Sequence, residues 1–108
     1  MSLLRSIFGK PDKKAASRQR AATKAETESD LLRWVEQTED QDSKDHSGVA
    51  PHPYERLAIM YRKREDYQRE VEILERHFRH RQAPGVKPQQ LRERLVKARE
   101  LLRQSRER

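Results

Sequence analysis

Cysteine is absent from this chain of 108 residues, so disulfide bonds and thiolate metal sites are excluded. Aromatic residues make up 6% and hydrophobic residues 32% of the chain, whereas charged residues reach 40%. A globular domain is typically about 45–50% apolar and about 25% charged, so we expect a small core. No apolar run approaches the roughly 18 residues that span a bilayer, and the N-terminus lacks the apolar region of a signal peptide. The sequence therefore predicts one small domain in the cytoplasm.

Signatures of catalysis are missing as well. The chain has no glycine-rich phosphate loop and no serine, histidine and aspartate in the spacing of a known hydrolase. His77 and His80 lie three residues apart and are candidate metal ligands. The arginines around them disfavour a cation through repulsion: Arg76, Arg79 and Arg81. We expect no enzymatic activity, no metal and no cofactor, and both histidines in contact with solvent.

Charge is distributed in blocks along the chain, whose net charge is +7. Basic residues outnumber acidic ones by seven to one in residues 1–24, whereas acidic residues outnumber basic ones by eight to two in residues 25–47. Basic residues then exceed acidic ones by eight to six in residues 48–83 and by eight to three in residues 84–108. Such blocks bind polyanions or attract one another within the molecule.

Residues 1–28 are predicted to form a flexible basic arm with an amphipathic tip. Residues 9–28 contain no large apolar side chain, so they cannot bury enough surface to offset the entropy of ordering. The tip consists of four apolar residues ahead of them: Leu3, Leu4, Ile7 and Phe8. We expect this tip to dock in a groove of a partner, to contact an anionic membrane surface weakly, or to stay disordered.

Residues 29–50 are predicted to form a short helix followed by an acidic linker. Thr27 or Ser29 is a suitable helix cap. Four apolar residues follow it: Leu31, Leu32, Trp34 and Val35. From Glu36 to Pro53 the chain is polar and acidic, which favours a linker. The helical domain is therefore expected to comprise residues 51–108.

Within residues 51–108 the apolar residues recur at helical spacing in three segments. Pro53 and Pro88 favour the first turns of the first and third helices. The predicted core residues are Tyr54, Leu57, Ala58, Tyr61, Tyr67, Val71, Leu74, Phe78, Leu91, Leu95 and Leu102. At this spacing the tyrosines are expected in the core rather than as a surface on which nucleic-acid bases stack. Residues 103–108 have no apolar partner and are expected to fray.

The segment 52–85 resembles a single tetratricopeptide repeat, a helix-turn-helix unit of about 34 residues. Family positions are matched by an early aromatic residue, a leucine and small-residue pair, two tyrosines and a bulky apolar residue: Tyr54, Leu57, Ala58, Tyr61, Tyr67 and Leu74. Glu65 stands where the family commonly has a turn glycine, and Glu70 replaces a small residue. Glu70 is therefore expected to lie outward or to mark a looser crossing of the two helices.

The resemblance implies an antiparallel hairpin that presents a binding surface, with the third helix as a cap or as the start of a further unit. Solenoid repeats need about three units to bury a continuous core. A single unit therefore implies self-association, a partner, or a compact three-helix fold. Its basic turn, Arg62, Lys63 and Arg64, is similar to the residues with which tetratricopeptide-like grooves hold acidic segments or chain termini.

We expect a non-enzymatic helical adaptor that binds a protein partner through this turn and the N-terminal tip. The alternative is a nucleic-acid-binding accessory protein that uses the basic arm and the third helix. The candidate contacts for the alternative are Arg92, Arg94, Lys97, Arg99 and Arg103. A homo-oligomer is compatible with either function.

Overall fold

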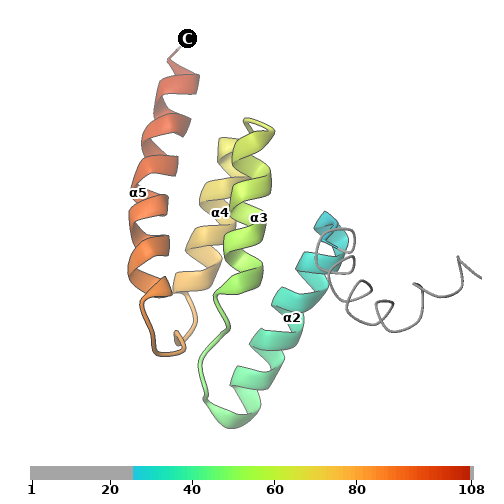
Figure 1. Ribbon diagram of the computed structural model, residues 1–108. Coiled ribbons are helices and arrows are strands. Elements are labelled where there is room, and N and C mark those ends of the chain that lie inside the picture. Colours follow the sequence, from blue (N-terminus) through green and yellow to red (C-terminus); the bar gives the residue numbers. More distant parts are fainter. Residues whose placement is uncertain (1–25, 108) are drawn as a thin grey trace, which may run out of the picture. The chain divides into compact units, whose positions relative to one another are not determined.

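The computed structural model describes residues 26–107, and within them the chain forms four α-helices and no strand. They are α2 (Glu28–Asp45), α3 (His52–Lys63), α4 (Tyr67–Phe78) and α5 (Lys87–Arg106), as Figure 1 shows. The predicted all-α class is confirmed. The predicted arm up to residue 25 and its tip, Leu3, Leu4, Ile7 and Phe8, lie outside the described residues.

The chain divides into two units, Met1–Asp30 and Leu31–Arg108. Of the first unit, the structure describes residues 26–30. In the first, the Thr27 hydroxyl accepts the backbone N–H of Asp30 at 3.2 Å, as the cap of a helix does. In the second, successive helices run antiparallel, and α4 packs against both α3 and α5 (Figure 1). No helix among residues 26–107 has the length and apolarity needed to cross a bilayer.

The core of the second unit confirms most of the predicted residues. Eight of them are buried: Tyr54, Leu57, Ala58, Tyr61, Val71, Leu74, Leu91 and Leu95. Phe78 and Leu102 are partly buried against this core, and Tyr67 is half-buried. Five further residues belong to the core: Leu31, Val35, Val49, Ile73 and Ala98. Leu31 and Val35 come from α2, so the core extends beyond the predicted three helices.

The predicted acidic linker was wrong, because α2 continues through it to Asp45. Two of its carboxylates point inward to basic residues that follow in the sequence: Glu39 lies 2.8 Å from Arg76, and Asp42 lies 3.4 Å from Arg81. Paired carboxylates do not need full hydration, so this acidic segment can pack as a helix against the rest of the fold. The compact unit therefore begins at Leu31 rather than at Pro51.

The connection between α2 and α3 is bonded to the loop after α4. Val49 N–H donates to the carbonyl of Arg81 at 2.7 Å, and Ala83 N–H donates to the carbonyl of Val49 at 3.4 Å. Gly48 has a φ of +91°, and a Cβ there would lie 2.5 Å from the Ala83 nitrogen. Only glycine fits this approach of the two backbones.

The turn between α3 and α4 closes one helix and starts the next. Glu65 N–H donates to the carbonyl of Arg62, and Asp66 N–H donates to that of Tyr61, both at 2.9 Å. Glu65 has a left-handed φ of +59°, which completes a Schellman motif. The Asp66 carboxylate accepts the N–H of Arg69 at 3.2 Å and caps α4.

The expected fraying after Leu102 is not observed, because α5 continues to Arg106. The Arg106 guanidinium donates to the side-chain oxygen of Gln68 in α4 at 2.8 Å. Arg103 lies 3.2 Å from the carboxylate of Glu107, one turn further on. Polar contacts rather than apolar ones therefore hold this end of the helix.

Candidate functional site

Glu70 lies inside the fold, where its side chain is 0% exposed, so the expectation that it lies outward was wrong. Arg62 of α3 approaches its carboxylate to 2.8 Å, and Arg94 of α5 approaches it to 3.4 Å. The Arg62 guanidinium also donates to the backbone carbonyl of Arg94 at 3.3 Å. Burying a charge requires compensating charges and hydrogen bonds, and two arginines from neighbouring helices supply them.

This arrangement separates Arg62 from the other two residues of the predicted basic turn. The Arg62 side chain is directed to Glu70 and is 29% exposed. Lys63 and Arg64 are exposed at the end of α3. Arg62 therefore supports the packing of three helices, and the surface of the turn consists of Lys63 and Arg64.

His77 is buried as well, whereas the sequence indicated contact with solvent. It is 0% exposed, and its ring lies edge-on to those of Tyr54 and Phe78 at centroid distances of 5.0 and 4.5 Å. Neither ring nitrogen has a hydrogen-bond partner among residues 26–107. Desolvation, with smaller contributions from His80 and Arg92, lowers the pKa of His77 to about 4. The imidazole is therefore neutral at pH 7.

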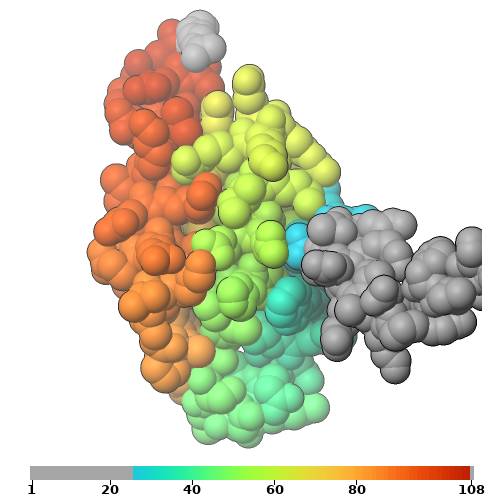
Figure 2. Space-filling view, in the orientation of Figure 1, coloured from blue at the N-terminus to red at the C-terminus, as the bar shows by residue number. Residues whose placement is uncertain are grey.

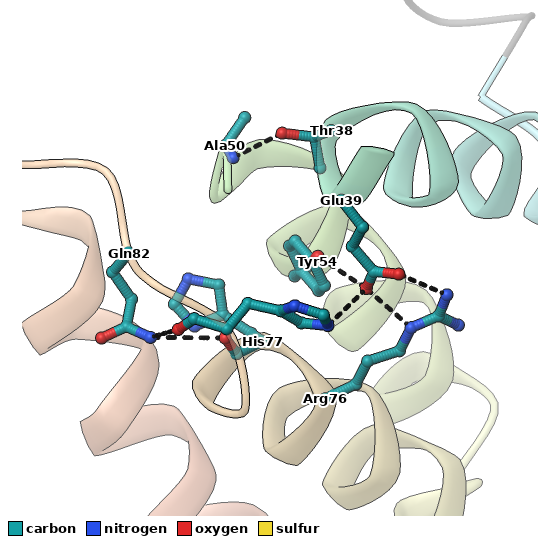
Figure 3. Close-up of polar contacts among 8 residues, drawn as sticks. Thr38, Glu39, Ala50, Tyr54, Arg76, His77 and Gln82 are labelled. Carbon is teal, nitrogen blue, oxygen red and sulfur yellow. Dashed lines mark hydrogen bonds and ion pairs between the residues drawn. The ribbon is translucent and has the colours of Figure 1, made fainter. Parts of the chain in front are cut away.

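His80 faces a different group, the carboxylate of Glu39 in α2, at 3.3 Å. The same carboxylate accepts hydrogen bonds from the Tyr54 hydroxyl at 2.9 Å and from Arg76 at 2.8 and 2.9 Å (Figure 3). We call these four residues the Glu39 cluster. In the part of the chain that the structure describes, no group of three or more His, Cys, Asp and Glu residues could hold a metal ion.

Electrostatics within the Glu39 cluster stabilise the ion pair. Desolvation acts to raise the pKa of Glu39, but the hydrogen bonds from Arg76 and Tyr54, together with charge attraction, outweigh it and lower the pKa. The hydrogen bond to Glu39 raises the pKa of Arg76. Desolvation and the bond to Glu39 together raise the pKa of Tyr54 far above its usual range. The cluster joins α2 to α3 and α4, so its polar groups serve the fold.

A groove between α4 and α5 is the strongest candidate for a functional surface. Its apolar lining consists of Phe78, Leu95 and Val96, and its charged lining consists of Glu75, Arg79, Arg92 and Arg99. Val96 is 62% exposed, so it lies outside the core and presents an apolar side chain at the surface. Side chains of α5 are exposed along the helix on the face drawn in Figure 2. The groove is therefore an apolar surface bordered by guanidinium groups.

Two of the three arginines in the groove have no carboxylate partner among the described residues. Arg99 lies 3.0 Å from Glu75. Arg92 is placed over the ring of Phe78, with its central carbon 4.8 Å from the ring centroid. Among residues 26–107 no carboxylate lies within ion-pair distance of Arg79 or Arg92. Their charge is available to a ligand.

The residues predicted to bind nucleic acid do not form one free basic surface. Arg94 is directed inward to Glu70, Arg99 is paired with Glu75, and Arg103 is paired with Glu107. Lys97 is exposed on α5, and Arg92 lies in the groove. Arg92 and Arg99 therefore lie in the same groove. Arg94 and Arg103 are paired with carboxylates outside it, and Lys97 is exposed but does not line it.

Sequence reasoning did not identify this groove. Phe78 and Arg92 lie on different helices, and only their helical register places the guanidinium over the ring. Val96 was not among the predicted core residues of the third helix. Its exposure beside a partly buried Phe78 is the signal that marks the surface.

Comparison with family models, with curated proteins and with solved structures found no match. The hairpin of α3 and α4 is observed (Figure 1), whereas its relation to tetratricopeptide repeats stays a prediction.

Proposed function

We propose that this protein is a non-enzymatic helical adaptor that binds a protein partner through the groove between α4 and α5. The observation that carries the proposal is the exposed apolar side chain of Val96 beside Phe78, together with the guanidiniums of Arg79 and Arg92, which have no carboxylate partner within the described part of the chain. Aromatic residues and arginine are enriched in the centres of protein interfaces.

The rigid support beneath the groove favours the same function. α4 is fixed to α3 and α5 through Glu70, and to α2 through the pairing of Arg76 with Glu39. A surface built on helices that are held in this way loses little conformational entropy when a partner binds. The N-terminal tip and the turn residues Lys63 and Arg64 are proposed as secondary contacts.

Site-specific photo-cross-linking in the native cell tests the proposal. A photoreactive amino acid at Val96 samples the groove. The same amino acid at Gln90, which is exposed on another face of α5 and does not line the groove, is the matched control. We expect a discrete cross-linked protein from position 96 and a much weaker product from position 90. Equal products from both positions, or none from either, would contradict the proposal.

Binding to nucleic acid is the second candidate, favoured by the net charge of +7 and by exposed Lys97. Titration of the full chain with single- and double-stranded DNA and RNA at two salt concentrations tests it. Phosphate contacts predict affinity that falls steeply with salt. Absence of binding at the lower salt concentration would remove this candidate.

A further inference from the structure

We infer that the groove between α4 and α5 binds an acidic amphipathic peptide segment, in which carboxylates flank a bulky apolar side chain. The inference rests on the proposed function and adds the chemistry of the partner. It follows from the position of Arg79, the residue that caps the end of α4, and of Arg92 in α5, both of which line the groove. The apolar side chains of Phe78, Leu95 and Val96 also line it.

Charge complementarity favours an acidic segment in this groove. At least nine basic side chains among residues 31–107 face a carboxylate of the same chain: Lys44, Arg62, Arg69, Arg76, Arg81, Lys87, Arg94, Arg99 and Arg103. Arg79 and Arg92 have no such partner among residues 26–107, and both are exposed. Guanidinium groups bind carboxylates in bidentate geometry and tolerate partial desolvation. Two free guanidiniums beside an apolar lining therefore suit a segment that carries both acidic and apolar side chains.

A peptide fits the groove better than a nucleic acid does. The face of Phe78 is covered by Arg92 at 4.8 Å, and the ring of His77 lies 4.5 Å from it. A base therefore lacks the open aromatic face on which it would stack. Glu75, with its side chain 41% exposed, also borders the groove and repels a continuous phosphate backbone. Separate carboxylates of a peptide can avoid Glu75 and reach Arg79 and Arg92.

The first residues of the chain itself do not have the required charge. Residues 1–24 carry seven basic residues and one acidic residue, so the guanidiniums of the groove repel them. A second copy of the chain could offer exposed acidic residues of α2 such as Glu36 and Asp40. A measurement of the oligomeric state distinguishes a second copy of the chain from a peptide of another protein.

The test begins with random peptides displayed on phage and selected on the immobilised full chain. Enriched peptides are synthesised with a fluorescent label, and their dissociation constants are measured by fluorescence anisotropy. We expect the enriched sequences to be rich in Asp and Glu around Leu, Ile, Phe or Trp. The double variant Arg79→Glu with Arg92→Glu should bind them at least about tenfold more weakly, because two attractive contacts become repulsive.

Lys97→Glu is the matched control, because Lys97 is an exposed basic residue of α5 that does not line the groove. Its dissociation constants should stay within about twofold of those of the parent chain, since peripheral charges change affinity little. Circular dichroism and thermal melting of both variants report whether the fold is retained. Val96→Ser, which keeps the charges, should weaken binding by about three- to tenfold through loss of apolar contact.

The outcomes separate this inference from the proposed function. Peptides that bind the double variant as tightly as the parent chain would overturn the groove assignment and leave the adaptor function standing. Enriched peptides without acidic residues would overturn the partner chemistry alone. If no peptide is enriched and a single-stranded oligonucleotide binds in a manner that the double variant abolishes, both proposals are wrong. Self-association that the double variant abolishes, measured by sedimentation, would replace the peptide with a second copy of the chain.

Discussion

The two ends of α4 bury polar groups by opposite means. Near its beginning, Glu70 is fully buried and meets the guanidiniums of Arg62 and Arg94. Near its end, His77 is equally buried, but aromatic rings surround it and neither nitrogen is hydrogen-bonded within residues 26–107. Ion pairs satisfy the polar atoms of Glu70, whereas desolvation keeps His77 neutral at pH 7.

The contacts that link α4 to its neighbouring helices also differ between its two ends. At the Glu70 end, the ion pairs connect α4 to α3 and α5, because each arginine comes from a different helix. At the His77 end, the connection to α2 is made by a neighbouring residue, Arg76, which binds Glu39. Compensated charge therefore joins helices at both ends, and the uncharged imidazole fills space between Tyr54 and Phe78. The two buried groups should respond differently to substitution and to pH.

The largest effect is expected from Glu70→Ala. This change leaves the Arg62 and Arg94 guanidiniums without their buried partner, so the free energy of unfolding should fall by about 3–5 kcal/mol. Urea denaturation followed by circular dichroism measures this difference. Glu75→Ala removes an exposed ion pair with Arg99 and should cost no more than about 1 kcal/mol. Similar losses in the two variants would show that burial does not make Glu70 special.

At the other end, acid should destabilise the protein through His77. Its ordinary pKa of 6.5 falls to about 4 in the folded chain. As pH falls from about 6.5 to about 4, the unfolded chain binds a proton that the folded chain does not, so the free energy of unfolding decreases. We expect a loss of about 2–3 kcal/mol over this range. Urea denaturation at a series of pH values measures it, and a flat profile between these pH values would contradict the neutral imidazole.

Replacing the imidazole should sharpen the contrast. His77→Leu replaces the imidazole with an apolar side chain of similar size and removes the proton-binding group, so the stability at pH 7 should change by less than about 1.5 kcal/mol. The decline between pH 6.5 and 4.5 should disappear. A further decline below the ordinary pKa of Glu39, 4.5, should remain, because the pKa of that carboxyl is lowered in the fold and protonation removes its pairing with Arg76. A variant that keeps the whole slope would assign the pH dependence to another group.

Apolar periodicity predicted the hairpin and α5, because their stripes of Tyr54, Leu57 and Tyr61, and of Leu91 and Leu95, face one core. The same reasoning failed for polar residues. His77 was expected in contact with solvent, Glu70 outward or at a looser helix crossing, and Glu39 in a linker. Their full or partial burial depends on partners far along the chain. Sequence spacing within one helix does not reveal a guanidinium on another.

The groove was missed for the same reason. Its three arginines are among the 25 basic residues of the chain, and the sequence does not show which basic residues are paired with acidic ones. The structure reveals the choice, because Arg62 and Arg94 share one carboxylate whereas Arg79 and Arg92 have none within the described residues. Pairing across helices therefore determines which charges stay available on the surface.

The smallest predicted effect concerns the turn that precedes the Glu70 end. Glu65 is exposed and has a left-handed φ of +59°, which costs a residue with a Cβ about 1–2 kcal/mol. Glu65→Gly relieves this cost but increases the conformational freedom of the unfolded chain, so a net gain of about 0.5–1 kcal/mol is expected. Glu65→Ala is the matched control, because it removes the carboxylate and keeps the Cβ. Chemical denaturation should place the glycine variant above both the parent and the alanine variant. If alanine and glycine stabilise equally, loss of the carboxylate rather than relief of backbone strain is the cause, and the helix junction before Glu70 is not strained.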